Sequence, residues 1–307
     1  MNRWTRAARV MILAACVSAV TALQTGCGRG NGGAPARAEG ELRLATFNVE
    51  ELAAPMDPSP SSEAHLEAVA KAIRRSDADI LALQGVQSLE AVRWFNQTYL
   101  SESGYTDIVS LDVGHSRGLE NAVLSRVPIT NSRVWPTLKI GGKHPSLAGG
   151  TPNPNSGKPI RFRRSPLMVQ VQLPGERTPI TLFIVEHKGG NRFAYWREAE
   201  AKAIVRLASD LGMHRRIVVL GSFHAPPDDP SLEAYTEGGF LNAIQHDNGP
   251  EMATEASGDT TDLVLANRAA LMSLDTANTF VVGLGDDIDG VQTEHFVVVI
   301  GVEQSDD

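Results

Sequence analysis

The chain has 307 residues, 42% of them hydrophobic and 21% charged, with a formal net charge of −8. This composition is ordinary for a globular protein, and no apolar run in the body reaches the roughly 20 residues that span a bilayer. Because the chain is strongly negative, we expect no strong nucleic-acid binding, although a local basic cleft is still allowed.

The N-terminus has the pattern of an export signal. Three arginines precede an apolar run from Val10 to Leu23, which predicts a signal peptide over residues 1–26. The run leads into Thr25-Gly26-Cys27, which is typical of a bacterial lipoprotein signal. We therefore expect an exported protein held at the membrane by lipid on Cys27, in the periplasm or cell envelope. The alternative is a soluble secreted protein whose signal is cut elsewhere.

The cysteines and the next segment define the domain boundaries. The only cysteines are Cys16 and Cys27, so a domain that begins after them has no disulfide, no thiolate zinc site and no cysteine nucleophile. Residues 27–40 are rich in Gly, Ala and Pro, which predicts a flexible tether. We expect one domain over residues 41–303, followed by a short tail at 304–307.

The body alternates short apolar strands with amphipathic helices. One helix is expected after the candidate N-caps Ser61 and Ser62, because Leu66, Val69 and Ile73 share a face, and a second over Ala194–Leu211. Strands are predicted at Leu42–Phe47, Ile80–Leu83, Ala122–Leu124, Leu167–Leu173, Ile180–Val185, Ile217–Leu220, Leu263–Leu265 and Phe296–Ile300. Strands mixed with helices predict a layered α/β domain.

A long stretch over residues 141–164, rich in Gly, Pro and Asn, is predicted to be an irregular loop. Its end carries Lys158, Arg161, Arg163 and Arg164. This basic segment is either a solvated strand or a rim that faces an anion, and the sequence favours neither.

Seven segments in order resemble the endonuclease/exonuclease/phosphatase family of the deoxyribonuclease I-like superfamily. They are LRLATFNVEEL, DADILALQGVQ, RGLENAVLSRVPI, TLFIVEHKGG, RRIVVLGSFHAPPDDPSL, TDLVLAN and QTEHFVVV. The resemblance implies a four-layer αββα sandwich, in which two mixed β-sheets pack face to face between outer helices. It also implies phosphoester hydrolysis with Mg²⁺ or Mn²⁺ at the ends of the strands.

The resemblance assigns roles to several residues. It implies catalytic roles for the side chains Asn48, His187, Asp262 and His295. It also implies metal-binding roles for two carboxylates, Glu50 and Glu294, and hard divalent cations prefer such oxygen ligands. Glu294 replaces a shorter aspartate, and a displacement of about 1 Å can lower a rate on the order of 100-fold.

Three positions depart from the family pattern. Gly85 replaces the principal metal-binding glutamate, Ser222 the aspartate that orients the nucleophile, and His224 its partner asparagine. Glycine offers no ligand, and serine is a far weaker base than a carboxylate. The departures predict a divergent member with a degraded active site.

Two functional hypotheses follow. The first is an exported pseudoenzyme, expected to be a monomer, that binds a phosphate-bearing ligand or a protein partner without turnover; Arg164 and Lys188 are the candidate phosphate-binding residues. The second is an active phosphodiesterase, phosphatase or nuclease with a rebuilt site, in which His187, His224 and His295 hold Zn²⁺.

Two residue pairs also have two interpretations each. Asp228 and Asp229 either form a turn and a helix start or compensate for the lost charge. Tyr195 and Trp196 either pack their helix against the domain or stack on a base. In both pairs the structural interpretation is the one we favour.

Overall fold

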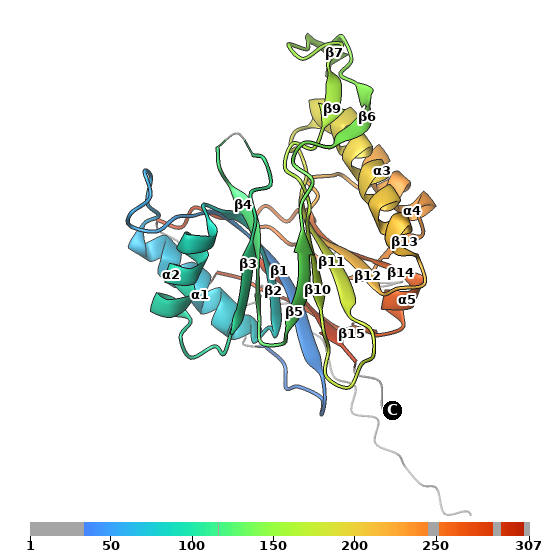
Figure 1. Ribbon diagram of the computed structural model, residues 1–307. Coiled ribbons are helices and arrows are strands. Elements are labelled where there is room, and N and C mark those ends of the chain that lie inside the picture. Colours follow the sequence, from blue (N-terminus) through green and yellow to red (C-terminus); the bar gives the residue numbers. More distant parts are fainter. Residues whose placement is uncertain (1–33, 116, 245–251, 285–289, 304–307) are drawn as a thin grey trace, which may run out of the picture.

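The computed structural model describes residues 34–115, 117–244, 252–284 and 290–303 (Figure 1). The predicted signal, Cys27 with its predicted lipid, most of the predicted tether and the predicted tail lie outside these ranges. Within the described ranges no helix has the length and apolarity needed to cross a membrane.

The first sheet has six strands around a parallel central pair. In spatial order they are β15 (Leu274–Val282), β16 (Val297–Val302), β1 (Leu42–Leu52), β2 (Ile80–Val86), β4 (Glu120–Ser125) and β3 (Asp107–Ser110). β1 and β2 are parallel, and the other pairs are antiparallel. Every residue of β2 is buried, which explains why its first four residues, Ile80–Leu83, form an apolar run in the sequence.

The second sheet also has six strands around a parallel pair. In spatial order they are β13 (Phe240–Asn242), β14 (Asp262–Asn267), β12 (Ile217–Ser222), β11 (Ile180–Glu186), β10 (Leu167–Val171) and β5 (Ile129–Arg133). β11 and β12 are parallel and the rest antiparallel. The carboxyl ends of a parallel pair lie at the same edge of a sheet.

The two sheets pack face to face, with helices on the outside (Figure 1). Along β1, Leu44 belongs to the core shared with the second sheet, whereas Ala45 and Phe47 belong to a separate core under the first pair of helices. This alternation follows from the two-residue period of a strand. Helices α1 (Glu63–Ser76) and α2 (Leu89–Tyr99) cover the first sheet.

Three helices accompany the second sheet: α3 (Ala194–Leu211), α4 (Pro230–Glu237) and the short α5 (Arg268–Leu271). A 3₁₀ turn, η1 (Asn191–Phe193), leads into α3. The layers are therefore helix, sheet, sheet, helix, and the predicted αββα sandwich is confirmed.

Local sequence signals explain where helix α1 begins. Ser62 is the N-cap, and its hydroxyl accepts a hydrogen bond from the His65 backbone N–H at 3.2 Å. The predicted apolar face of Leu66, Val69 and Ile73 is buried. The amphipathic pattern and the cap therefore predicted this helix correctly.

The predicted loop over residues 141–164 is more regular than expected. It contains two small antiparallel ladders: β6 (Lys139–Lys143) with β9 (Pro159–Arg161), and β7 (Leu147–Ala148) with β8 (Thr151–Pro152). They project beyond the sheets beside the start of α3 (Figure 1). The Tyr195 hydroxyl lies 2.9 Å from His144 Nδ1, and Trp196 Nε1 donates to the Arg161 carbonyl at 2.8 Å. The two aromatic residues thus pack the helix against this extension.

A close backbone contact joins the parallel strands of the second sheet. Gly221 pairs with Val185 and has a φ of +137°. A Cβ atom at residue 221 would lie 2.0 Å from the Val185 carbonyl oxygen. Only glycine allows this approach, which places the following residue, Ser222, at the sheet edge.

We expect Gly221→Ala to lower the free energy of unfolding by more than about 3 kcal/mol, because the added methyl overlaps a backbone oxygen. Gly157→Ala is the matched control, since its φ is +77° but no atom lies within 4 Å of its Cβ; it should lower the free energy by about 1–2 kcal/mol. Urea unfolding measures both. Equal losses would contradict the close contact.

Candidate functional site

A network of four buried side chains joins the two sheets where their strands end. Asn48 lies in β1, Ser222 ends β12, Asp262 begins β14 and His295 just precedes β16. Asn48 Nδ2 donates to Ser222 Oγ at 3.0 Å, and Ser222 Oγ donates to Asp262 Oδ1 at 2.5 Å. His295 Nδ1 lies 2.7 Å from Asp262 Oδ2. The sequence-predicted residues Asn48, Asp262 and His295 therefore meet.

Backbone hydrogen bonds hold the network in place. The hydroxyl of Thr293 donates to the Asn48 carbonyl at 2.7 Å and accepts from the His295 N–H at 3.1 Å. Thr254 Oγ1 accepts from the Asp262 N–H at 3.0 Å. With Nδ1 bound to Asp262, the other ring nitrogen of His295 faces Asn48 Nδ2 at 3.3 Å. Hydrogen bonds to a ring's own partners and to its backbone fix the orientation of an imidazole.

The Asp262–His295 pair determines the charge of the imidazole. Burial alone would lower the pKa of His295, but the hydrogen bond to Asp262 and the charges of Asp262, Glu255 and Glu50 raise the pKa above its ordinary value. The charged imidazolium is therefore favoured over a wider pH range than in an isolated histidine. Such a group can attract and bind an anion.

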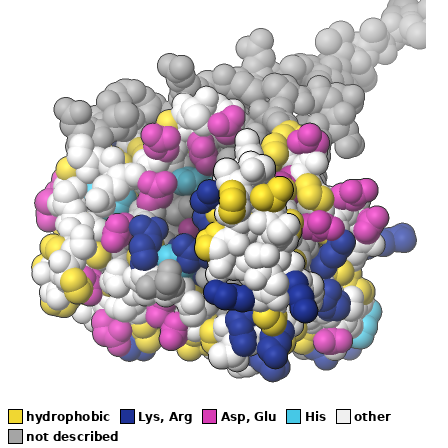
Figure 2. Space-filling view, turned by 90° about the horizontal axis from the view of Figure 1, so that it is seen from above, with side chains coloured by type: hydrophobic (Ala, Val, Ile, Leu, Met, Phe, Trp, Pro, Cys, Tyr) yellow, Lys and Arg dark blue, Asp and Glu magenta, His cyan; other side chains and the backbone are white. Residues whose placement is uncertain are grey.

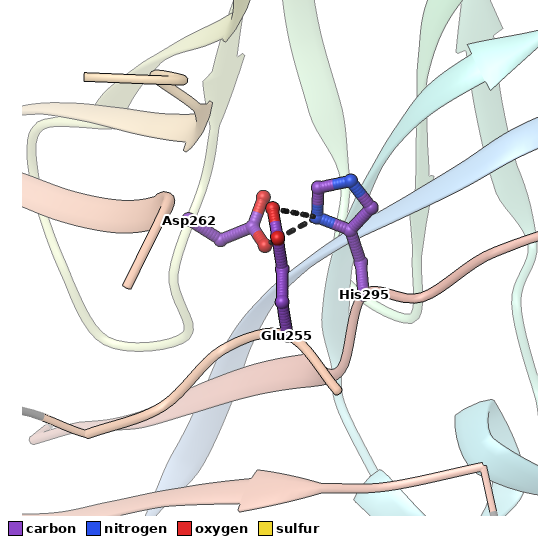
Figure 3. A group of neighbouring side chains, drawn as sticks. All are labelled: Glu255, Asp262 and His295. Atoms are coloured by element: carbon purple, nitrogen blue, oxygen red, sulfur yellow. Dashed lines mark hydrogen bonds and ion pairs between the residues drawn. The ribbon is translucent and has the colours of Figure 1, made fainter. Parts of the chain in front are cut away.

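Glu255 belongs to this site although no sequence motif indicated it. Its Oε1 lies 3.5 Å from His295 Nδ1, and the two residues form a β-bridge (Figure 3). The hydroxyl of Thr261 also donates to this carboxylate. Glu255 precedes β14 in a segment without strand or helix periodicity, so only the folded chain shows that it lies beside His295.

Glu255, Asp262 and His295 could together hold a metal ion. Each offers one ligand atom, and these atoms lie within 4.8 Å of one another. Among the described residues no other group has this spacing, so His187 and His224 are not part of such a cluster. A mixed carboxylate and imidazole set suits Mn²⁺ or Zn²⁺ better than Mg²⁺.

Position 85 does not fit the metal that the family resemblance implies. Gly85 has a φ of +79°, and a Cβ atom there would lie 3.1 Å from the backbone N, Cα and C atoms of Glu50. Glu50 itself has a φ of 56°. The strand pairing on both sides of β2 is shifted at this point, between Asn48 and Leu52 and between Gln84 and Val86. A glutamate at position 85 would therefore press its Cβ against the Glu50 backbone and would need an unfavourable φ.

The two predicted metal carboxylates, Glu50 and Glu294, are both exposed. Glu50 Oε1 lies 3.8 Å from His295 Nε2, but its side chain is 43% exposed. Burial raises the pKa of Glu50; His295 lowers it, whereas Glu294, Glu255 and Asp262 raise it further. Glu294 is exposed. We therefore derive no chemical step through a metal ion.

His187 reaches the end of β11 as predicted, but it lies outside the network. Its Nδ1 is 2.9 Å from Glu200 Oε2 and its Nε2 is 3.0 Å from the Tyr235 hydroxyl. The ring is buried and packs edge-on against Phe223. Because both ring nitrogens have protein partners, the histidine anchors α3 and α4 to the strand end.

His224 lies beside the network in a left-handed backbone conformation, with a φ of 47°. Its ring packs edge-on against that of His295, with centroids 6.0 Å apart. Burial lowers the pKa of His224 to about 4, more than the charge of Asp262 raises it, so the ring is neutral near pH 7. It therefore packs beside His295 without adding a charge.

Cations gather next to the histidines. Buried Arg164 pairs with Glu186, and burial together with the charges of Arg163 and Arg117 lowers the pKa of Arg164 to about 9. The charge of Arg164 in turn lowers the pKa of His224. Viewed from above, histidine side chains lie in a hollow with Lys and Arg side chains beside it (Figure 2). The cations thus lie on one side of the histidines, whereas Asp262, Glu255 and Glu50 lie around His295.

The paired aspartates after β12 have a structural role. Asp229 is the N-cap of α4 and accepts from the Ser231 N–H at 3.0 Å. It also forms a buried ion pair with Arg197, at 2.5 Å. The helix-start interpretation is confirmed for Asp229, which is engaged there and does not compensate for the charge lost at Ser222.

Comparisons with known proteins give a family and a fold. The sequence profile of the Endonuclease/Exonuclease/phosphatase family matches residues 45–281, whereas a search of curated proteins found no match. A functionally unknown conserved protein from Enterococcus faecalis V583 has 18% identity and a TM-score of 0.59, covering 86% of this chain and 100% of that one.

Two further solved structures share the fold. The human Nocturnin catalytic domain, with a bound sulfate anion, has 14% identity and a TM-score of 0.60, covering 86% of this chain and 93% of that one. TDP2 from D. rerio, complexed with a single-strand DNA product, has 12% identity and a TM-score of 0.60, covering 86% and 99%. At these identities the similarity extends to the fold alone.

We expect Asp262→Asn to lower the pKa of His295, because the substitution removes the main charge and the charged hydrogen bond that oppose the effect of burial. Glu255→Gln should lower it less, since this carboxylate is 3.5 Å away and contributes through charge. NMR titration of the imidazole nitrogens in the presence of EDTA measures both. An unchanged pKa in Asp262→Asn would contradict the pairing.

Proposed function

The chain belongs to the endonuclease/exonuclease/phosphatase family, and we propose that it binds a phosphate-bearing ligand at the strand-end network without the metal-dependent hydrolysis that the family resemblance implies. The backbone at position 85 is the observation that carries this proposal. A glutamate there would need a φ of +79° and would press its Cβ against Glu50. The positive φ and the close contact with Glu50 support the loss of a metal ligand at this position.

Ser222 supports the same proposal. Its hydroxyl sits between Asn48 and Asp262, so it replaces a carboxylate while keeping the network connected. A hydroxyl at this position holds the neighbouring side chains but cannot take a proton from water as a carboxylate can. The substitution keeps the hydrogen-bonded network connected and removes a basic group.

The remaining groups favour binding of an anion. His295 has a raised pKa and a ring held by Asp262, and the Asn48 amide lies beside it. Buried Arg164, which pairs with Glu186, lies close enough for its charge to lower the pKa of His224. A phosphate oxygen accepts hydrogen bonds from imidazolium and amide groups, and cations stabilise its charge.

The location of the protein is part of the proposal. The arginines and apolar run before Cys27 support export, with a lipid on Cys27 holding the domain at a membrane. A tether of Gly, Ala and Pro residues would let the domain extend from the surface. Ligands would then be phosphate compounds outside the cytoplasm.

A second candidate function is phosphoester hydrolysis at a rebuilt site. The observation that favours it is the close cluster of Glu255, Asp262 and His295. In this case the cluster would hold Mn²⁺ or Zn²⁺, which would supply Lewis-acid stabilisation of the phosphate charge. Asp262 and His295 would then lose the hydrogen bond between them, because the same atoms would bind the ion.

One experiment separates the two candidates. We expect no hydrolysis of bis(p-nitrophenyl) phosphate or p-nitrophenyl phosphate with Mg²⁺, Mn²⁺ or Zn²⁺, and binding of inorganic phosphate that His295→Ala weakens about tenfold by calorimetry. The control is His214→Ala, which changes an exposed histidine away from the network. Turnover that is lost in His295→Ala but kept in His214→Ala would overturn the first candidate and support the second.

Restoring the family residue is a second test. We expect Gly85→Glu to lower the free energy of unfolding by about 1–3 kcal/mol, because of its positive φ and the contact with Glu50, and to give no metal-dependent hydrolysis. Urea unfolding and the same two substrates measure this. A stable variant that gains hydrolysis would mean that the backbone at position 85 accommodates a metal-binding glutamate.

A further inference from the structure

A cavity of about 340 Å³ lies between the β7–β8 hairpin and the start of α3. Its walls carry three cations, Arg163, Lys188 and Arg192, and two aromatic side chains, Phe193 and Trp196. None of its lining residues is Asp or Glu. The volume is at the lower end of the range for small-ligand pockets, and it is larger than a single phosphate group needs.

The cations in this cavity repel one another. The Lys188 ammonium and the Arg192 guanidinium both lie on the Phe193 ring, 4.4 and 4.6 Å from its centroid. Burial, together with the charges of Arg163 and Arg192, lowers the pKa of Lys188. The nearby carboxylate of Glu200 already accepts from the Arg163 backbone N–H and contacts His187. An anion in the cavity would relieve the repulsion.

The start of α3 adds a further favourable field. The helix is 18 residues long, its N-cap is Phe193, and no side-chain hydrogen bond caps it, although the Ala194 N–H donates to the Asn191 carbonyl of the preceding 3₁₀ turn. Its first turn contains no acidic residue. The partial positive charge of this helix N-terminus therefore adds to the positive charges of Lys188 and Arg192.

The cavity is separate from the strand-end network but lies near it in the fold. Lys188 directly follows His187, whose ring turns away to Glu200 and Tyr235. The three cations and the lining segment of residues 148–155 lie outside the Asn48–Ser222–Asp262–His295 hydrogen bonds. A ligand in the cavity therefore does not require any group of the network.

We propose that this cavity is a second anion site, which takes the diphosphate group of a small ligand. Three cations match the two to three negative charges of a diphosphate, and Arg side chains suit its pairs of oxygens. The space left over, bounded by Phe193 and Trp196, accepts a small organic carrier. The inference goes beyond the proposed function, because it does not depend on what binds at His295.

Calorimetry with inorganic pyrophosphate tests the site. In the His295→Ala protein, where the network is weakened, we expect one remaining site, and we expect the added change Arg192→Ala to weaken it about tenfold. Lys188→Gln should have a similar effect. Arg177→Ala, at an exposed arginine in the β10–β11 turn, is the matched control and should leave binding unchanged.

Trp196 provides a local readout. Pyrophosphate should change the tryptophan fluorescence of the wild-type protein, and the change should disappear in Trp196→Phe while calorimetric binding persists. Unaltered pyrophosphate binding in both Arg192→Ala and Lys188→Gln would overturn the proposal. If His295→Ala binds phosphate normally but Arg192→Ala loses pyrophosphate, the proposed function fails and the second site stands.

Discussion

A buried carboxylate is the interaction on which the site depends. Asp262 is fully inaccessible, and its two oxygens accept from Ser222 and His295. Burying an ionised carboxylate is strongly unfavourable unless it is hydrogen-bonded and paired. Because Ser222 belongs to the second sheet and His295 precedes a strand of the first, this requirement joins the two sheets at the strand ends. The network thus holds the two sheets together at their strand ends and is also a candidate ligand site.

Backbone conformation determines which side chains fit at the strand-end network. Positive φ angles occur at Glu50, Gly85, Gly221 and His224, all around the strand ends. Such conformations are uncommon for side chains other than glycine and persist where the surrounding structure holds them. At Gly85 the result is that the Glu50 backbone lies close to the point where a side chain would begin. At Gly221 it is a close approach that sets Ser222 between Asn48 and Asp262.

Charge is distributed unevenly over the molecule. The chain as a whole carries −8, yet Arg163, Lys188 and Arg192 line one cavity that has no acidic lining residue. Net charge governs the behaviour of a protein at a distance, whereas a bound anion responds to the groups within a Debye length of about 8 Å. The acidic net charge is therefore compatible with the two anion sites proposed above. The expectation of weak nucleic-acid binding therefore does not conflict with phosphate recognition.

The sequence by itself determined the layers, because apolar periodicity predicts strands and helices and the ordered segments predicted the αββα sandwich. The resemblance of its ordered segments to the family also assigned roles to Asn48, Asp262 and His295. Only the tertiary structure decided that His187 turns to Glu200 and Tyr235, that Glu255 joins His295, and that Glu50 closes position 85. These depend on side-chain direction and on contacts between residues far apart in the chain, and periodicity carries no information about either.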